Sequence, residues 1–97
     1  MILGEMMTHE SSKPFLQAVK KETAPAYYDK IKEPMWIEKI QEKLRNGEYA
    51  EGKPELFVYD VELIFKNAKL FNPVNSIYFK KAVELEGRVR PLLKQFD

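Results

Sequence analysis

A side-chain amide and a phenol are the groups in this sequence whose types and surroundings suit ligand binding. Asn72 follows the apolar pair Leu70-Phe71 and precedes Pro73, and Tyr27 lies 45 residues upstream in a separate segment. An amide N–H can donate a hydrogen bond to an uncharged acceptor, and apolar neighbours can form the walls of a small pocket around it. The pair therefore suits a pocket for a neutral ligand.

The composition excludes several kinds of chemistry. The chain has no cysteine, so it has no disulfide, no thiolate metal site and no thiol nucleophile. His9 is the only histidine, and no obvious cluster of partner ligands accompanies it in the sequence, which makes it a poor metal candidate. Neither a phosphate-binding glycine-rich loop nor a nucleophile motif occurs. We therefore expect a protein that is not an enzyme and that uses no cofactor and no metal.

The charge balance argues against nucleic acid or a membrane as the main partner. Sixteen basic residues against fifteen acidic ones give a formal net charge of +1, so no overall field attracts the chain to an anionic surface. The pairs Lys20-Lys21 and Lys80-Lys81 are most simply solvated, and a DNA contact through them would be weak at most. No secretion signal and no stretch of roughly 20 apolar residues is present, so we expect no membrane partner.

The length sets the domain organisation. The chain has 97 residues, of which 44% are hydrophobic, and this is enough for one compact domain over residues 1–97. Both ends stop close to patterned segments, so we expect a monomeric domain that belongs to a larger protein.

Four helical segments are expected to position the amide and the phenol, and no run of alternating β-branched residues competes with them. Pro34 and Pro54 are favoured in a first helical turn, whereas Gly47 and Pro73 end a helix. We expect helices at residues 2–9, 34–46 and 54–71, and a fourth after a capping Asn75 or Ser76. The first of these helices is short or truncated.

The connection at residues 10–34 is long and contains three prolines. A connection of this length is usually functional or disordered. Its aromatic and aliphatic side chains argue against disorder, because they have something to bury against. We expect an ordered loop with one or two short helical turns.

Each of the last three helices carries an apolar stripe at helical spacing. The residues expected to face the core are Met35, Ile37, Ile40 and Leu44 in the second helix, Phe57, Val61, Ile64, Ala68 and Phe71 in the third, and Tyr78, Ala82, Leu85, Val89 and Leu92 in the fourth. Gly87 and Pro91 are expected to weaken or kink the end of the fourth helix. Together, these helices and the connection at residues 10–34 predict an all-α helical bundle with one long, structured connection.

Two motifs agree in order and spacing with a known family. Residues 27–35, YYDKIKEPM, and residues 57–72, FVYDVELIFKNAKLFN, together resemble the bromodomain family. The resemblance implies a left-handed four-helix bundle with a pocket for N-acetyl-lysine between the first long loop and the connection of helices 3 and 4. It also implies a nuclear protein that binds acetylated histone tails or other acetylated proteins. The subfamily stays open, because residues 14–34 are closer to the acetyltransferase-associated branch and Pro34-Met35-Trp36 occurs in some nuclear-body relatives.

The resemblance also implies roles for the polar residues. Asn72 matches the asparagine that donates to the acetyl carbonyl, Tyr27 the tyrosine that reaches it through water, and Tyr78 the gatekeeper. Each residue also has a plainer reading. Asn72 alone would be a helix-end residue, Tyr27 a packed loop residue, and Tyr78 an aromatic side chain at the edge of the core.

The apolar walls of the implied pocket come from the same comparison. Pro14 and Phe15 occupy the place of the family's apolar shelf, and Val19 matches a valine in the pocket wall. Ala68 and Phe71 match the helix face beneath the site.

Two departures from the family pattern support an alternative function. Lys13 stands where many relatives have a tryptophan, and Ala24 stands where a larger aliphatic residue is common. With Lys13 the shelf is expected to lose its largest aromatic wall, and with Ala24 the pocket is expected to be wider and wetter. The alternative is a helical protein-interaction scaffold with a degenerate pocket that does not read acetyl-lysine.

Overall fold

The computed structural model describes residues 2–20, 22, 24–49 and 54–94 of the chain. The elements in chain order are α1 (Ile2–Thr8), the 3-10 helix η1 (Glu10–Phe15), α2 (Tyr27–Lys30), α3 (Ile37–Arg45), α4 (Pro54–Phe71) and α5 (Ile77–Leu93). Every regular element in these ranges is helical, which confirms the predicted all-α class. Within the same ranges, no helix has the length and apolar character needed to span a bilayer.

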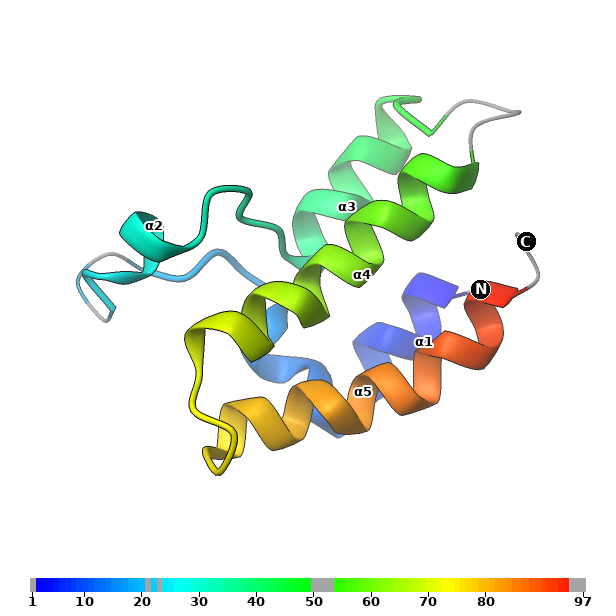
Figure 1. Ribbon diagram of the computed structural model, residues 1–97. Helices are drawn as coiled ribbons and strands as arrows, with labels where there is room; N and C mark the ends of the chain where they lie inside the picture. Colours follow the sequence, from blue (N-terminus) through cyan, green and yellow to red (C-terminus); the bar gives the residue numbers. More distant parts are fainter. Residues whose placement is uncertain (1, 21, 23, 50–53, 95–97) are drawn as a thin grey trace.

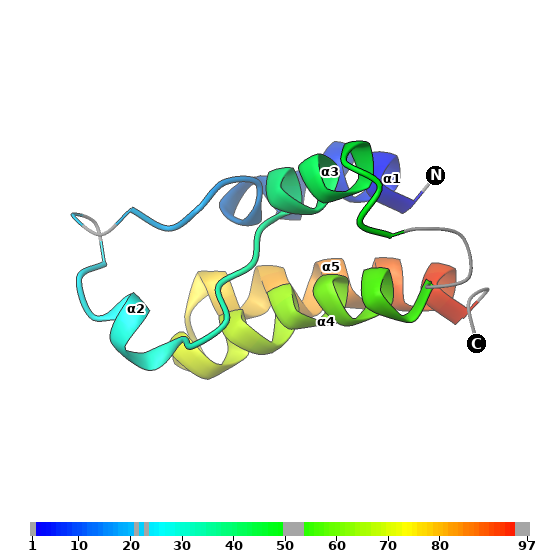
Figure 2. The ribbon, with the colours of Figure 1, turned by 90° about the horizontal axis from the view of Figure 1, so that it is seen from above.

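Four of these helices form a closed bundle in which each packs against two others. α1 packs against α3 and α5, and α4 also packs against α3 and α5. α4 and α5 run antiparallel side by side, and a short connection joins them at one end of the bundle (Figure 1). The long connection with α2 extends from the same end, whereas the start of α1 and the end of α5 lie at the other (Figure 1 and Figure 2). The predicted bundle with a long, structured connection is thereby confirmed.

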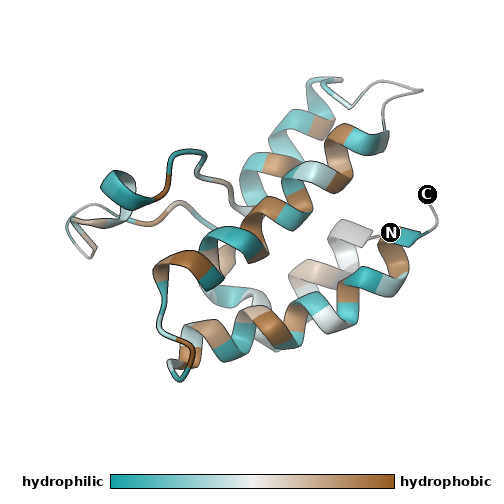
Figure 3. Cartoon of the chain, viewed as in Figure 1, coloured by the Kyte–Doolittle hydropathy of each residue, from teal (hydrophilic) through white to brown (hydrophobic). Residues whose placement is uncertain are grey.

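The core is made of apolar side chains from all four bundle helices and from η1. Its buried members are Met6, Phe15, Ile37, Ile40, Val61, Ile64, Phe65, Ala68, Ala82, Leu85, Val89 and Leu93. Hydrophobic and hydrophilic residues alternate along the helices (Figure 3), which is the pattern of helices that bury one stripe and expose the rest. This core fixes the ends of α4 and α5, and so places the connection between them.

The boundaries of α4 and the start of α5 agree with the predicted signals. α4 begins at Pro54 and ends at Phe71, as expected. The Ser76 side chain caps α5 by accepting a hydrogen bond from the backbone N–H of Phe79 at 3.2 Å. α5 continues through Gly87 and Pro91 to Leu93, and the kink expected near its end stays a prediction.

The predicted start of the second helix is wrong. α3 begins at Ile37, and its N-cap residue Trp36 has φ −149° and ψ 164°, which is an extended conformation. Pro34 and Met35 therefore precede the helix and belong to no regular element. The predicted end is correct, since α3 stops at Arg45 and Gly47 adopts a positive φ of 75° that favours glycine.

Two residues of the predicted stripes do not enter the core. Leu44 is 41% exposed because it lies in the last turn of the short α3, and Tyr78 is 51% exposed because it lies in the first turn of α5, at the end of the bundle. Leu92 is half-buried, and its neighbour Leu93 is the buried residue at this position. The other predicted stripe residues of the three helices are buried or half-buried.

η1 and α2 are the short helical turns expected in the long connection. The first helix ends at Thr8, one residue earlier than expected, and His9 instead caps η1 by accepting the N–H of Ser11 at Nδ1, 3.1 Å away. Lys21 of the predicted basic pair and part of the turn after Gly47 lie outside the described residues.

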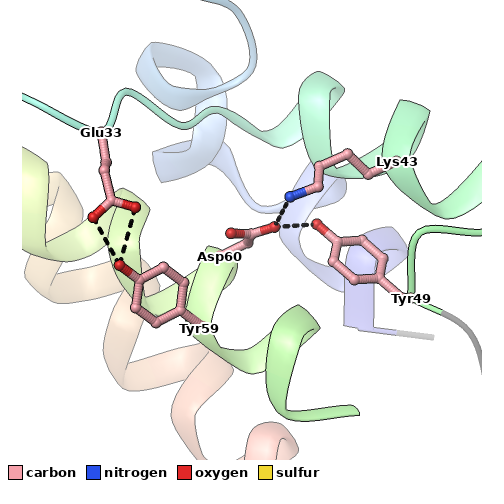
Figure 4. A network of polar contacts seen from close by, with 5 residues as sticks. All are labelled: Glu33, Lys43, Tyr49, Tyr59 and Asp60. Atoms are coloured by element: carbon pink, nitrogen blue, oxygen red, sulfur yellow. Dashed lines mark hydrogen bonds and ion pairs between the residues drawn. The ribbon is translucent and has the colours of Figure 1, made fainter. Parts of the chain in front are cut away.

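A polar cluster joins α3 to the middle of α4. The buried Asp60 carboxylate accepts hydrogen bonds from Lys43 Nζ at 2.6 Å and from the Tyr49 hydroxyl at 2.5 Å (Figure 4). On the preceding residue of α4, the Tyr59 hydroxyl donates to the Glu33 carboxylate at 2.9 Å (Figure 4). These bonds hold α3 and the segment before it against α4.

Candidate functional site

A cavity of about 440 Å³ lies between the long connection and the helices α4 and α5. All eight residues predicted to form the site line this cavity: Pro14, Phe15, Val19, Tyr27, Ala68, Phe71, Asn72 and Tyr78. Eight further residues line the cavity that were not among the predicted site residues, although Ala24 was noted as a change that affects the pocket: Gln17, Lys20, Ala24, Tyr28, Pro34, Met35, Trp36 and Ile64. The fold therefore brings the predicted set together around one pocket of a size typical for small-ligand sites.

Asn72 is held at the end of α4 by two bonds to one carbonyl group. Its backbone N–H donates to the Ala68 oxygen at 3.0 Å, and its side-chain Nδ2 donates to the same oxygen at 2.9 Å. The side-chain bond fixes the orientation of the amide, and it uses only one of the two N–H groups on Nδ2. The second N–H is available to an acceptor in the pocket.

Tyr27 is buried in α2 and packs edge-on against two aromatic rings. Its ring centroid lies 4.9 Å from that of Phe71 and 5.2 Å from that of Tyr28. Burial, with a further contribution from Tyr28, raises the pKa of the Tyr27 hydroxyl above its ordinary value. The phenol therefore stays neutral at physiological pH and can donate or accept a hydrogen bond.

Tyr28 supports the pocket wall by a hydrogen bond to the backbone of Val19. Its hydroxyl donates to the carbonyl oxygen of Val19 at 2.5 Å, across nine residues of the connection. Two backbone bonds tighten the same loop, from Ala24 N to Lys20 O and from Tyr27 N to Ala24 O, both at 3.0 Å. The Tyr-Tyr pair was visible in the motif at residues 27–35. No local signal in the sequence indicates that the Tyr28 hydroxyl bonds to the backbone of Val19.

The segment before α3 forms a further wall that the sequence placed inside a helix. Asn67, buried in α4, donates its side-chain amide to the Glu33 carbonyl oxygen at 2.8 Å. The backbone N–H of Glu38 donates to the Leu16 carbonyl oxygen at 3.0 Å, which joins the start of α3 to the residue after the shelf. These bonds hold residues 34–36 extended along the cavity.

Trp36 supplies an aromatic surface on this wall. It is half-buried and lines the cavity, and Lys39 Nζ lies 5.1 Å from its ring centroid, within range of a cation–π contact. Lys13 is exposed and does not line the cavity, whereas its neighbours Pro14 and Phe15 do. The absence of a tryptophan at position 13 therefore does not leave the pocket without a large aromatic residue.

The electrostatic character of the cavity follows from its lining. Lys20 is the one basic residue among the described lining residues, and none of them is a carboxylate. A cationic side chain entering the cavity would thus lack an anionic partner there. In the described part of the chain, no group of three or more His, Asp or Glu side chains is arranged to hold a metal ion.

Tyr78 lies at the edge of the cavity rather than in the core. It is in the first turn of α5 and is half exposed, yet it lines the cavity together with Asn72. This position corrects the prediction that Tyr78 belongs to the inward stripe, and its role as gatekeeper stays a prediction.

Comparisons with known proteins agree on one family. The family model named Bromodomain matches residues 1–84. The chain is 39% identical over 85 residues to the histone acetyltransferase GCN5 of Yarrowia lipolytica, which covers 88% of this chain and 18% of that protein. It is 47% identical over 76 residues to mouse bromodomain adjacent to zinc finger domain protein 2B, which covers 78% of this chain and 4% of that protein.

A solved structure supports the same assignment. The bromodomain of human BAZ1A superposes with a TM-score of 0.90 at 33% identity, over 97% of this chain and 86% of that one. The chain spans less than a fifth of the length of the curated relatives described above.

Proposed function

The chain belongs to the bromodomain family, and on this basis we propose that its pocket binds acetyl-lysine in peptides of acetylated histones or other acetylated proteins. The observation that carries the proposal is the position of Asn72, whose side-chain amide is oriented by Ala68 and keeps one N–H for an acceptor in the pocket. In this proposal that N–H donates to the acetyl carbonyl oxygen, and Tyr27 reaches the same oxygen through water.

Acetylation is the chemical change that such a pocket can detect. A free lysine ammonium would lose solvation worth several kcal/mol in an apolar cavity, and no described carboxylate lines this cavity to receive it. Acetylation removes the charge and leaves an amide, whose carbonyl oxygen a single donor can satisfy. The cavity therefore favours the acetylated side chain over its cationic precursor.

The expected affinity is modest. Burial of an acetyl-lysine stem of about 150 Å² contributes roughly 4 kcal/mol at about 25 cal/mol per Å². The hydrogen bond to Asn72 adds about 1 kcal/mol. Association entropy offsets part of this sum, so a single mark is expected to bind with Kd on the order of 10 μM to 1 mM.

The proposed protein context is a chromatin protein in the nucleus. We propose that residues 1–97 form one monomeric reading domain of a larger protein, without catalytic activity of their own. The acetyltransferase named among the relatives is matched over 18% of its length, so its name does not assign that activity to this chain. Any DNA contact is proposed to be weak, because the net charge is +1.

Calorimetric titration with paired peptides tests the proposal. One peptide carries acetyl-lysine and the other carries lysine at the same position, and each is titrated into the native chain and into the variants Asn72→Ala and Asn75→Ala. Asn75 is an exposed asparagine in the same connection that does not line the cavity, so it is a matched control. Binding of the acetylated peptide alone, lost in Asn72→Ala and kept in Asn75→Ala, is the expected result.

The same titration distinguishes the alternative function. If the folded chain binds both peptides equally or binds neither, the proposal fails. The helical scaffold with a degenerate pocket, suggested by Lys13 and Ala24, would then be the better description.

A further inference from the structure

The end of α4, the connection after it and the start of α5 expose three large apolar side chains. Val74 is 72% exposed, Ile77 is 62% exposed and Leu70 is 51% exposed. We call these three residues the apolar rim. Together with Tyr78, they account for four of the nine large hydrophobic residues that are exposed in the described part of the chain. Hydrophobic residues are visible at the end of α4 and in the connection that follows it (Figure 3).

The apolar rim is continuous with the pocket along the chain. Leu70 directly precedes the pocket residue Phe71, and Ile77 directly precedes the pocket residue Tyr78. Consecutive Cα atoms are about 3.8 Å apart, and Val74 follows the pocket residue Asn72 by two positions, so the backbone of each rim residue is close to that of a residue that lines the cavity. A peptide whose acetyl-lysine enters the cavity must leave the cavity past its edge.

The same segment carries no charge. Residues 70–79 form the longest uncharged run in the sequence, in a chain of which 32% of residues are charged. The neighbouring Lys69 forms an ion pair with Glu86, and Lys20 is the basic residue that lines the cavity. This segment offers apolar contact, and no residue within it is a carboxylate that could pair with a basic side chain of the ligand.

A second copy of the chain is a poor fit to the apolar rim. A stable protein interface buries about 800 Å² on each partner and involves roughly 20 to 30 residues a side. The three residues of the apolar rim together with Tyr78 form a surface much smaller than such an interface. A surface of this extent can contact one or two side chains of a peptide.

We infer that the acetylated ligand places an apolar side chain close to its acetyl-lysine on the apolar rim, so that this domain selects acetyl-lysine in an apolar sequence context over a basic one. The inference rests on the proposed function and adds to it the chemistry of the flanking residue. Val74 and Ile77, which are the most exposed of the rim residues, supply the contact.

A leucine scan of the ligand tests the inference. The probe is an acetyl-lysine peptide with alanine at all other positions, in which leucine or lysine replaces one alanine at a time on either side of the mark. Fluorescence anisotropy gives Kd for each peptide. At one or more positions leucine is expected to strengthen binding about fivefold, because it buries apolar area on the rim, and lysine at the same position is expected to give no gain.

Variants of the chain assign the gain to its surface. In Val74→Ser/Ile77→Ser, the leucine gain is expected to fall below about twofold, while Kd for the all-alanine peptide stays the same. Leu56→Ser is the matched control, since Leu56 is 44% exposed near the other end of α4. The single variant Val74→Ser, at the most exposed of these positions, repeats the test, and circular dichroism checks the fold of each variant.

Three outcomes would overturn the inference. The first is that no leucine position strengthens binding, and the second is that the gain persists in Val74→Ser/Ile77→Ser. The third is self-association of the native chain that this double variant abolishes, which would assign the surface to a second copy. If the all-alanine acetylated peptide itself does not bind, the proposed function fails as well, and this result separates the two failures.

Discussion

The Asn67 side-chain amide donates a hydrogen bond of 2.8 Å to the Glu33 carbonyl oxygen, across 34 positions of the sequence. The bond joins a buried residue in the middle of α4 to the last residue before the pocket wall at residues 34–36. It explains why this segment is extended rather than helical, since a tertiary partner takes the backbone carbonyl. The wall of the candidate site thus depends on a residue that does not line the cavity.

Replacement of Asn67 by alanine is predicted to weaken both the fold and the pocket. The Glu33 carbonyl would lose its partner, which costs about 1 to 3 kcal/mol of unfolding free energy, and the wall at residues 34–36 would be less well held. Urea denaturation and peptide titration measure the two effects. Asn46→Ala, at the exposed end of α3, is the control, and equal behaviour of the two variants would contradict the role of Asn67.

Tyr28→Phe is predicted to reduce ligand affinity by loosening the pocket wall. It deletes the bond from the Tyr28 hydroxyl to Val19 O, which is worth about 1 kcal/mol, so Kd should rise about fivefold. Trp36 is the only tryptophan and lines the cavity, so its fluorescence reports the titration. Tyr59→Phe, which removes the exposed bond to Glu33, should leave Kd within about twofold of native, and an equal loss in both variants would refute the prediction.

Asp60→Ala is predicted to destabilise the chain while leaving the pocket able to bind. Asp60 is buried and accepts bonds from Lys43 and Tyr49, so its removal should cost about 2 kcal/mol, less than for a fully buried pair because Lys43 is partly exposed. Along the axis of α4, Asp60 lies about 18 Å from Asn72. Thermal unfolding and titration below the melting transition measure the two properties.

The control for Asp60 is Glu62→Ala, an exposed carboxylate on the same helix, which should change the unfolding free energy by less than about 0.5 kcal/mol. If Asp60→Ala abolished binding in a chain that is still folded, the separation of the polar cluster from the site would be wrong.

Stability is predicted to fall at alkaline pH through the hydroxyls of Tyr27 and Tyr49, whose pKa values are raised in the folded state. Burial, followed by the interaction with Tyr28, raises the pKa of Tyr27 above the ordinary value of 10.0. Burial, followed by the bond to Asp60, likewise raises the pKa of Tyr49. A raised pKa means that the folded state holds its proton more tightly than the unfolded state. The resulting stability is fully present below pH 10.0 and is lost as the pH rises toward the folded pKa values.

Denaturant titrations at a series of pH values measure this effect. The unfolding free energy should be insensitive to these two groups near neutral pH and should decline above about pH 10. Tyr27→Phe and Tyr49→Phe should each make the decline shallower. A chain whose stability rises with pH in this range would contradict the raised pKa of the two hydroxyls.

Local signals in the sequence were sufficient to predict much of the fold. Pro54, Pro73 and Ser76 set the boundaries of α4 and α5, because proline and capping residues act within one turn of where they stand. The eight predicted site residues also meet around one cavity, since they sit at helix ends and in a loop that the bundle brings together. Their roles in binding stay predictions.

The errors come from contacts between distant parts of the chain. Pro34 is a good first-turn residue, yet the bond from Asn67 to Glu33 and the one from Glu38 to Leu16 hold the following residues extended. These long-range bonds place Trp36 in the pocket wall. No local sequence pattern at residues 34–36 predicts this position. Tyr78 has the spacing of the apolar stripe of α5. It is nevertheless half exposed, because it lies in the first turn of the helix, beyond the end of the core.

A crystal structure of the chain with a bound acetyl-lysine peptide tests the central claim most directly. The account predicts that the acetyl carbonyl oxygen lies about 2.9 Å from Asn72 Nδ2, on the N–H that Ala68 does not use. It also predicts that the acetyl methyl group lies in the cavity against the apolar walls. An acetyl group bound elsewhere on the chain, or an Asn72 side chain turned out of the cavity, would contradict the account.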